Sequence, residues 1–343
     1  MVKKTWFRFG LVFIVCIVLL YLFFRSVEWK EVLGYLVDIK IKYLILLFLL
    51  APFHLVTRAV RWDYLLMHEK KGVKFFNRFA GNAVGFTVTL VFPGRLGELV
   101  KPLYLAKKED IRKGFAIGTV VVERIFDIIT MCFLLGLFLL SKPLYSSYFN
   151  ANEEAYSNLY FWGTIGSIIG LALFVLILVI YFFKEKSLSV TAFLLKPFPH
   201  KISTKILKLT EEFIEGLKFF HSIGNLLTYI VLSFVVWLGI VLYYWVFFFA
   251  YDISLPFFFI LPYVFLILVG ASIPTPGMVG GFDYFSKLGL TTLYGINANQ
   301  AVGMTIVVHS IQVAVTCIIG YVILWKEGLS IFQVKKMGEE TES

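Results

Sequence analysis

The sequence predicts an all-α polytopic membrane protein, with about six full spans and two re-entrant helical dips arranged as an inverted repeat. Hydrophobic residues make up 59% of the 343 residues and charged residues only 16%. The mean hydropathy is +0.84, whereas soluble domains have roughly 45–50% apolar and about 25% charged residues. Several apolar runs also reach the ~20 residues that cross a bilayer as a helix. Lipid is therefore the expected solvent for most of the chain.

The apolar runs fall into two classes by length. Full-length runs lie at 7–24, 43–66, 114–140, 159–183, 226–250 and 300–325. Two shorter runs, 76–92 and 256–273, each lead into a proline–glycine break. Proline removes a backbone donor and glycine frees the backbone, so we expect both shorter helices to end at these breaks.

The distribution of lysine and arginine predicts the orientation. Basic residues concentrate in five regions: the N-terminus, 67–78, 94–113, 184–222 and the tail 326–343. Segments 141–158 and 251–255 are poor in them. The positive-inside rule makes the basic regions cytoplasmic, and the mixed stretch 25–42 is then external. We expect a multi-pass protein of the cell (inner or plasma) membrane with both termini in the cytoplasm.

The two shorter runs are expected to be re-entrant. Loops 67–78 and 94–113 are both basic, so the segment 76–92 between them must enter and leave from the cytoplasmic face. Such backbone is tolerated at bilayer depth only where protein or a water-filled cavity shields it. By the same reasoning, 256–299 starts outside and returns there before the last span.

The chain divides into two halves of opposite orientation. The expected parts are a first membrane repeat 1–140, an external loop 141–158, a second membrane repeat 159–325 and a cytoplasmic tail 326–343. The second repeat includes a cytoplasmic, amphipathic segment at 184–222, either interfacial or packed on the protein. Each half reads span, span, dip, span, as in transporters built from inverted repeats with sites near the midplane.

The breaks themselves match between the halves, although short Pro/Gly strings can also match by chance. Both contain a Pro-Gly-x-x-Gly string. The residues of the breaks are Pro93, Gly94 and Gly97 in the first half, and Pro274, Pro276, Gly277, Gly280 and Gly281 in the second.

Charged residues at bilayer depth are the candidates for function, because they are costly there and face a cavity or one another. Arg58 and Arg61 share a helical face at i, i+3, and guanidinium groups suit bidentate phosphate binding. The alternative is that both arginines snorkel to the cytoplasmic interface.

The first break carries three further candidates, Arg95, Glu98 and Lys101. Freed N–H groups at the start of a following helix can hold an anion. Glu98 could pair with Arg95, with Lys101 or with an arginine of another span. The alternative is a cytoplasmic turn with a surface ion pair.

The span 114–140 contains Glu123, Arg124 and Asp127. Three charged side chains in one span are not expected to face lipid. They either form a structural network that neutralises Arg58 and Arg61 or belong to a transport pathway, and both roles can coexist. The counterparts in the second half are Asp283, His309 and Gln312. For His309 and Gln312, which share a helical face, the plainer interpretation is an interhelical hydrogen bond.

Other functions are not supported by the sequence. It contains no nucleotide-binding loop, metal-binding cluster or nucleophile beside a base, so we expect no cofactor, no metal and no catalytic residues. The net charge of +10 follows from the cytoplasmic loops, so nucleic acid is not an expected partner. Cys16, Cys132 and Cys317 lie in apolar runs and are expected to pack as small hydrophobes. The aromatic run 243–249 is interpreted as lipid-facing, with an acyl-chain groove as the alternative.

Four segments together resemble the flippase-like membrane region of lysylphosphatidylglycerol synthases: RAVRWDYLL, FPGRLGELVKPLYLAKK, VVERIFDI and PTPGMVGGFDYF. The same region occurs alone in many small membrane proteins. The resemblance implies a module that moves lipids between leaflets, whereas a separate soluble domain makes the aminoacyl lipid in the larger relatives. No such domain follows the last span here, so aminoacyl transfer is not expected. The resemblance carries over to Arg58, Arg61, Arg95, Glu98, Glu123, Arg124 and the break 276–281.

These observations lead to the hypothesis of a translocase for lipids or lipid-linked glycans that binds an anionic phosphate head group. The expected partners are membrane lipids, either an anionic phospholipid or a polyprenyl-phosphate-linked sugar, with a homo-oligomer left open. One alternative is a membrane-embedded transferase acting on lipid phosphates, in which Glu98 works with Glu123 or Asp127. Another is an accessory subunit of a lipid- or glycan-modifying enzyme.

Overall fold

The computed structural model describes residues 2–25, 27–141, 182–199 and 223–342, with scattered positions at 157–180 and 203–214. Every regular element in these residues is helical, as the sequence predicts. Three apolar helical segments of the described chain are long enough to cross a membrane. They are α3 with α4 (Ile41–Leu50 and Phe53–Leu66), α12 (Ile223–Phe249) and α15 (Ala298–Lys326).

A fourth span exists if α1 (Val2–Phe24) and α2 (Trp29–Val37) act together, although they are bent by 86° to one another. Helix α7 (Lys113–Leu140) has 28 residues, which is about 42 Å of helix and enough to cross a bilayer. The expected loop 141–158 and most of the span 159–183 lie outside the described residues. Within the segment 184–222, α10 (Lys184–Leu194) is described, and most of the remainder is not.

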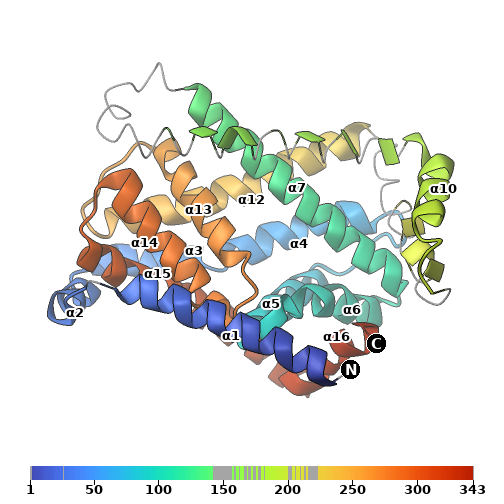
Figure 1. The fold of residues 1–343 in the computed structure, drawn as a ribbon, viewed down its shortest axis with the longest axis horizontal. Coiled ribbons are helices and arrows are strands. Elements are labelled where there is room, and N and C mark those ends of the chain that lie inside the picture. The colour runs from blue at the N-terminus through green and yellow to red at the C-terminus, as the bar shows by residue number, and fades with distance from the viewer. Residues whose placement is uncertain are drawn as a thin grey trace.

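Two helical hairpins occupy the positions of the expected dips (Figure 1). The first hairpin consists of α5 (Phe75–Val91), the short turn η1 (Pro93–Arg95) and α6 (Gly97–Glu109). The second hairpin consists of α13 (Leu261–Ala271), the turn η6 (Pro276–Met278) and α14 (Gly281–Tyr294), and the turn η5 (Phe257–Ile260) precedes it. The expectation that 94–113 is a loop is therefore wrong for 97–109. The residues Val100, Leu103 and Tyr104 form a buried apolar stripe on that helix.

Glycines let the two arms of each hairpin touch. A Cβ atom added to Gly97 would lie 1.8 Å from the carbonyl oxygen of Gly85, so no side chain fits there. The second hairpin repeats this contact: a Cβ atom on Gly281 would lie 2.4 Å from the carbonyl oxygen of Gly270. Backbone packs directly on backbone in both hairpins.

The two breaks share an unusual backbone and contact each other. In η1, Gly94 and Arg95 have φ angles of 82° and 56°, and in η6, Gly277 and Met278 have φ angles of 64° and 58°. Each break thus places a glycine and then a side-chain-bearing residue in the left-handed region. The N–H of Gly94 donates to the carbonyl oxygen of Pro274 at 3.2 Å. The tips of the two hairpins are therefore joined through the backbone.

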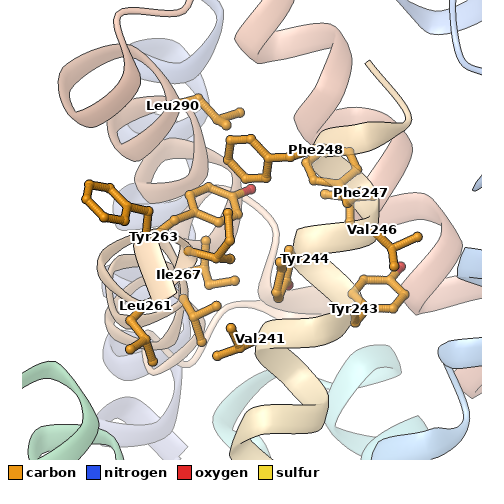
Figure 2. Packing of buried hydrophobic residues seen from close by; sticks show 14 of the residues in the cluster. Val241, Tyr243, Tyr244, Val246, Phe247, Phe248, Leu261, Tyr263, Ile267 and Leu290 are labelled. Carbon is orange, nitrogen blue, oxygen red and sulfur yellow. The ribbon is translucent and has the colours of Figure 1, made fainter. Parts of the chain in front are cut away.

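The largest apolar core lies where α12 meets α13 and α14 (Figure 2). Tyr244, Phe247 and Phe248 of α12 are buried there, and the rings of Tyr244 and Phe248 both meet Tyr263 of α13 edge to face. The interpretation of 243–249 as lipid-facing is therefore wrong. A helix that is apolar on all sides can be enclosed by protein as readily as by lipid.

The expected tail is a helix in the structure. Helix α16 (Ile331–Glu342) follows α15 and packs on α6, with Ile331 and Val334 buried in a cluster that includes Val100 and Tyr104. In the view of Figure 1 the two ends of the chain lie at the same end of the molecule.

A buried carboxylate joins the two arms of the first hairpin at the end opposite the break. Glu109 accepts hydrogen bonds from the Lys74 N–H at 3.1 Å and the Asn77 side chain at 2.7 Å, and pairs with Lys70 at 2.9 Å. Burial by itself would raise the pKa of Glu109, but these bonds outweigh it and hold the pKa below its ordinary value. A lowered pKa means stabilisation that is present at neutral pH and is lost as the pH falls through that pKa.

We therefore expect Glu109→Gln to lower the thermal stability at pH 7 and to reduce the loss of stability that the wild type shows on acidification. Thermal unfolding in detergent across acidic and neutral pH measures both effects. Asp110→Asn at the neighbouring left-handed position is the matched control. An unchanged pH profile for Glu109→Gln would show that the clamp does not contribute.

Candidate functional site

A buried ion network joins α4 to α7. Arg58 of α4 lies 3.2 Å from Glu123 and 2.8 Å from Asp127 of α7, and Arg61, one turn further on, lies 3.1 Å and 2.8 Å from the same two carboxylates. All four residues are at most 4% exposed. The i, i+3 spacing of the arginines and the i, i+4 spacing of the acids place the two pairs face to face. The arginines therefore do not snorkel to the interface.

Helices α6 and α12 complete the network. The ammonium group of Lys101 from α6 lies 2.5 Å from Oε2 of Glu123 and over the ring of Trp62 at 4.5 Å. From α12, the Trp237 indole N–H donates to Oδ1 of Asp127 at 3.2 Å, and the Ser233 hydroxyl accepts from Arg61 at 3.2 Å. Each carboxylate oxygen thus has a partner. The sequence places Lys101 in the basic loop 94–113 and makes it a candidate partner of Glu98, whereas in the structure it is 3% exposed and pairs with Glu123.

Two more arginines lie at the side of this network. Arg124 of α7 lies 3.4 Å from Asp127 and 4.0 Å from Glu123. Arg95 of the first break pairs with Glu98 at 3.4 Å, and both side chains are one-third exposed. Of the partners considered for Glu98, the one in the structure is Arg95.

A cavity of about 200 Å³ lies between the first break and helices of both halves. Its apolar wall includes Phe86 and Leu90 of α5, Trp237 and Ile240 of α12, and Ile267 of α13. Its polar side chains come from both halves of the chain: His54, Arg58, Arg95, Arg124, Tyr243, Tyr244, His309, Gln312 and Thr316. The cavity is therefore lined mostly by apolar side chains and also carries three arginines.

The second-half candidates form a separate polar group at the edge of the cavity. His309 Nδ1 lies 2.7 Å from Asp283, and His309 Nε2 lies 2.8 Å from the carbonyl oxygen of Gly277 in the second break. A carbonyl oxygen only accepts, so Nε2 carries a proton, and a second proton lies between Nδ1 and the carboxylate. Gln312 donates to the Tyr244 hydroxyl at 2.8 Å.

The structure thus brings the residues singled out in the sequence into one region. Those that line the cavity are Arg58, Arg95, Arg124, His309 and Gln312. Those that lie behind the lining residues and hold them are Arg61, Glu98, Lys101, Glu123, Asp127 and Asp283. The break residues Pro93, Gly94, Gly97, Pro274, Pro276, Gly277, Gly280 and Gly281 build the adjoining tips.

Sequence reasoning missed the contributions of α12 and of the α3–α4 junction. Trp237 and Ser233 are embedded in a run of 27 mostly apolar residues, where a single tryptophan or serine carries no positional signal. His54 lies near the N-terminus of α4 and bonds the Ala51 carbonyl at 2.8 Å. These side chains gain their role only when α4, α7 and α12 pack together.

Comparison with known proteins assigns the chain to a family of membrane proteins. The sequence matches the family described as the lysylphosphatidylglycerol synthase TM region over residues 7–320, which includes every residue of the network and both breaks. It is also 26% identical over 205 residues to the UPF0104 membrane protein MJ1595 of Methanocaldococcus jannaschii, with 56% of each chain covered. The alignment thus spans little more than half of that relative. The chain belongs to the family of the lysylphosphatidylglycerol synthase transmembrane region.

Proposed function

We propose that this protein is a membrane translocase for lipids or lipid-linked glycans, whose cavity binds the anionic phosphate head group. The observation that carries the proposal is the convergence of Arg58, Arg95 and Arg124 on one cavity with otherwise mostly apolar walls. Guanidinium groups are the side chains best suited to bidentate phosphate binding. A charge at the bilayer centre costs several kcal/mol, at least about 2.5–3.5 kcal/mol for a charged side chain. Paired cations in a cavity remove much of that cost.

The size of the cavity suits a head group. Sites for drug-sized ligands have volumes of about 300–1,000 Å³, whereas this cavity has about 200 Å³. The head group would occupy it while the acyl or prenyl chain stays in the bilayer. This arrangement avoids transferring the apolar chain through water.

The two hairpins supply the moving parts of the proposal. Their similar breaks, the repeated glycine contacts and the joined tips support an inverted repeat, in which each hairpin dips from the opposite face of the inner membrane and both termini are cytoplasmic. Transporters of this type alternate by moving one repeat against the other around a central site. Separation of Gly94 from Pro274 would open the cavity toward one leaflet.

The contacts of the carboxylates favour transport over chemistry. A transferase acting on lipid phosphates needs a carboxylate that is free to take a proton. Glu123 lies within 4.0 Å of four cationic side chains and Asp127 within 4.0 Å of three, and Glu98 is paired with Arg95. Cations held this close keep a carboxylate ionised and make it a weak base.

A proteoliposome assay tests the proposal. The purified protein is reconstituted with phosphatidylglycerol carrying a fluorescent acyl chain, and an external reductant reports how fast the label reaches the outer leaflet. We expect the wild-type protein to accelerate this exchange and Arg95→Gln to slow it at least tenfold, because one of the three cavity arginines is lost. Fluorescently labelled polyprenyl phosphate is assayed in the same way.

The matched control is Arg112→Gln. Arg112 also pairs with a carboxylate, Glu69, at 2.5 Å, but it is not among the residues that line the cavity. Its exchange rate should equal that of the wild type. Exchange of both lipids at the rate of protein-free vesicles would refute the translocase, and equal rates for Arg95→Gln and wild type would refute the cavity as its site.

A further inference from the structure

The ion network behind the cavity contains more positive than negative charge. It has four cationic side chains and two carboxylates, all linked by contacts of 4.0 Å or less: Arg58, Arg61, Lys101 and Arg124 against Glu123 and Asp127. Arginine is always charged in proteins. Burial disfavours the charged form of Lys101, but the ammonium group lies against Glu123 and over the Trp62 ring, and both contacts favour the charge. The network therefore carries an excess of two positive charges.

The other ionisable groups around the cavity leave this excess unchanged. Arg95 is balanced by Glu98, and the proton shared between His309 and Asp283 makes that pair neutral. His54 donates Nδ1–H to the carbonyl oxygen of Ala51, and burial beside the Arg58 cation disfavours a second proton, so the ring is neutral. Among the described residues that line the cavity, these complete the charged and titratable groups except for the phenols of Tyr243 and Tyr244, which are neutral at physiological pH.

The excess charge is concentrated on the side of the network that faces the cavity. Arg61 and Lys101 lie behind the carboxylates and occupy oxygens of both, whereas Arg58 and Arg124 line the cavity. Arg58 is 4% exposed, yet its Nε has no hydrogen-bond partner, and the same holds for the Nε of Arg124 and of Arg61 behind the carboxylates. Buried donors of this kind are normally satisfied. The two network arginines that line the cavity therefore combine uncompensated charge with incompletely satisfied guanidinium groups.

We infer that the cavity selects a head group with two negative charges, a lipid phosphate monoester or diphosphate, over a phosphodiester with one. This inference rests on the proposed function and narrows its substrate class. Charge left uncompensated in a low-dielectric site is costly. A doubly charged head group makes the network neutral, whereas a phosphodiester leaves one positive charge. A phosphate monoester carries about −1.5 to −2 charges at neutral pH, because its second pKa is about 6.

A matched pair of probes tests this without any transport. Decyl phosphate and methyl decyl phosphate have the same tail and differ by one methyl group and one negative charge. Each is titrated calorimetrically into the full-length protein in nanodiscs of phosphatidylcholine, in a gluconate buffer free of chloride. We expect decyl phosphate to bind at least tenfold more tightly at pH 7.5, and decyl diphosphate to bind at least as tightly as decyl phosphate.

A second titration at pH 5 distinguishes the phosphate monoester, which loses its second negative charge at this pH, from the diphosphate, which keeps two. Decyl phosphate then carries close to one charge, so its advantage over the methyl ester should fall toward one, while decyl diphosphate keeps its preference. The methyl ester reports any change in the protein itself between the two pH values, because that change would affect both probes. In Arg124→Gln the excess falls to one charge and the preference at pH 7.5 should shrink several-fold, whereas Arg124→Lys should retain it.

Equal affinities for the two probes at pH 7.5, a preference that persists unchanged at pH 5 for decyl phosphate, or no binding of either probe would overturn the inference. The experiments can refute the translocase and the charge selectivity independently of each other. Arg95-dependent exchange of phosphatidylglycerol with equal probe affinities would leave a translocase without this selectivity. A clear preference for the monoester without any exchange of lipid would leave a binding site and refute the translocase.

Discussion

Replacing Glu123 by alanine is expected to destabilise the protein by about 3–5 kcal/mol, the cost of removing one partner from a buried ion pair. Arg58, Arg61 and Lys101 share this carboxylate, and Glu123 itself is 0% exposed. Its loss leaves the buried excess one charge higher and removes the acceptor of Arg61 Nη2 and of Lys101 Nζ, whereas Arg58 keeps Asp127. Thermal unfolding of the purified protein in detergent, followed by tryptophan fluorescence, measures the effect.

A charge-matched pair separates electrostatics from packing. Glu123→Gln keeps the shape of the side chain and should destabilise nearly as much as alanine, because the charge is the part that is lost. The double variant Glu123→Gln, Lys101→Met restores the original excess and should recover part of the stability, and a double-mutant cycle measures that coupling. Glu339→Gln removes a half-exposed carboxylate paired with Lys335 and should leave unfolding unchanged. An unfolding temperature for Glu123→Gln equal to that of the wild type would contradict the network.

Adding one methyl group to Gly97 is expected to be the other severe change. In Gly97→Ala the new Cβ would meet the Gly85 carbonyl oxygen at 1.8 Å. The obstacle is backbone rather than a flexible side chain, so the arms of the first hairpin must separate. Overpacking a core costs about 1–3 kcal/mol and occasionally more, and we expect the upper end. Gly281→Ala should act in the same way on the second hairpin, at 2.4 Å from the Gly270 carbonyl oxygen.

Gly34→Ala is the matched control, because Gly34 lies within a helix and nothing is found within 4 Å of an added Cβ atom. It should be neutral or slightly stabilising, since alanine favours helix more than glycine does. Unfolding temperatures of the three variants in the same detergent give the comparison. If the unfolding temperature of Gly97→Ala equals those of Gly34→Ala and the wild type, the close approach of the two arms is not required for stability.

The sequence predicts which charged residues matter better than it predicts their partners. Arg58, Arg61, Glu123 and Asp127 stand out because charges in apolar runs must be compensated, and their spacing places each pair on one helical face. Which helices face each other depends on packing along the whole chain. The burial of Lys101 is not predicted, because the positive-inside rule counts every lysine of a basic segment as solvated. In the structure Lys101 lies on α6 and contacts Glu123.

The interior of the fold is less predictable for two physical reasons. The segment 97–109 has a polar composition that resembles a loop. Its helix is stabilised by contacts with α5, the other arm of the same hairpin, and with α16, which is distant in sequence. The aromatic run of α12 has no polar face, so its periodicity cannot separate burial in protein from exposure to lipid. The breaks are visible in the sequence, but the hydrogen bond that joins them runs between backbone atoms and leaves no mark on residue type.

That backbone contact also orders the synthesis of the protein in time. Gly94 and its acceptor Pro274 are separated by about 180 positions, and ribosomes add about 5–20 residues per second. The first hairpin is therefore complete about 10–40 s before the carbonyl group that caps its tip has been made. During that interval the turn at its tip lacks the hydrogen-bond acceptor that it has in the finished protein. Chaperones that bind incompletely synthesised membrane proteins are expected to recognise this intermediate. Arrest of translation between the two hairpins would lengthen its lifetime.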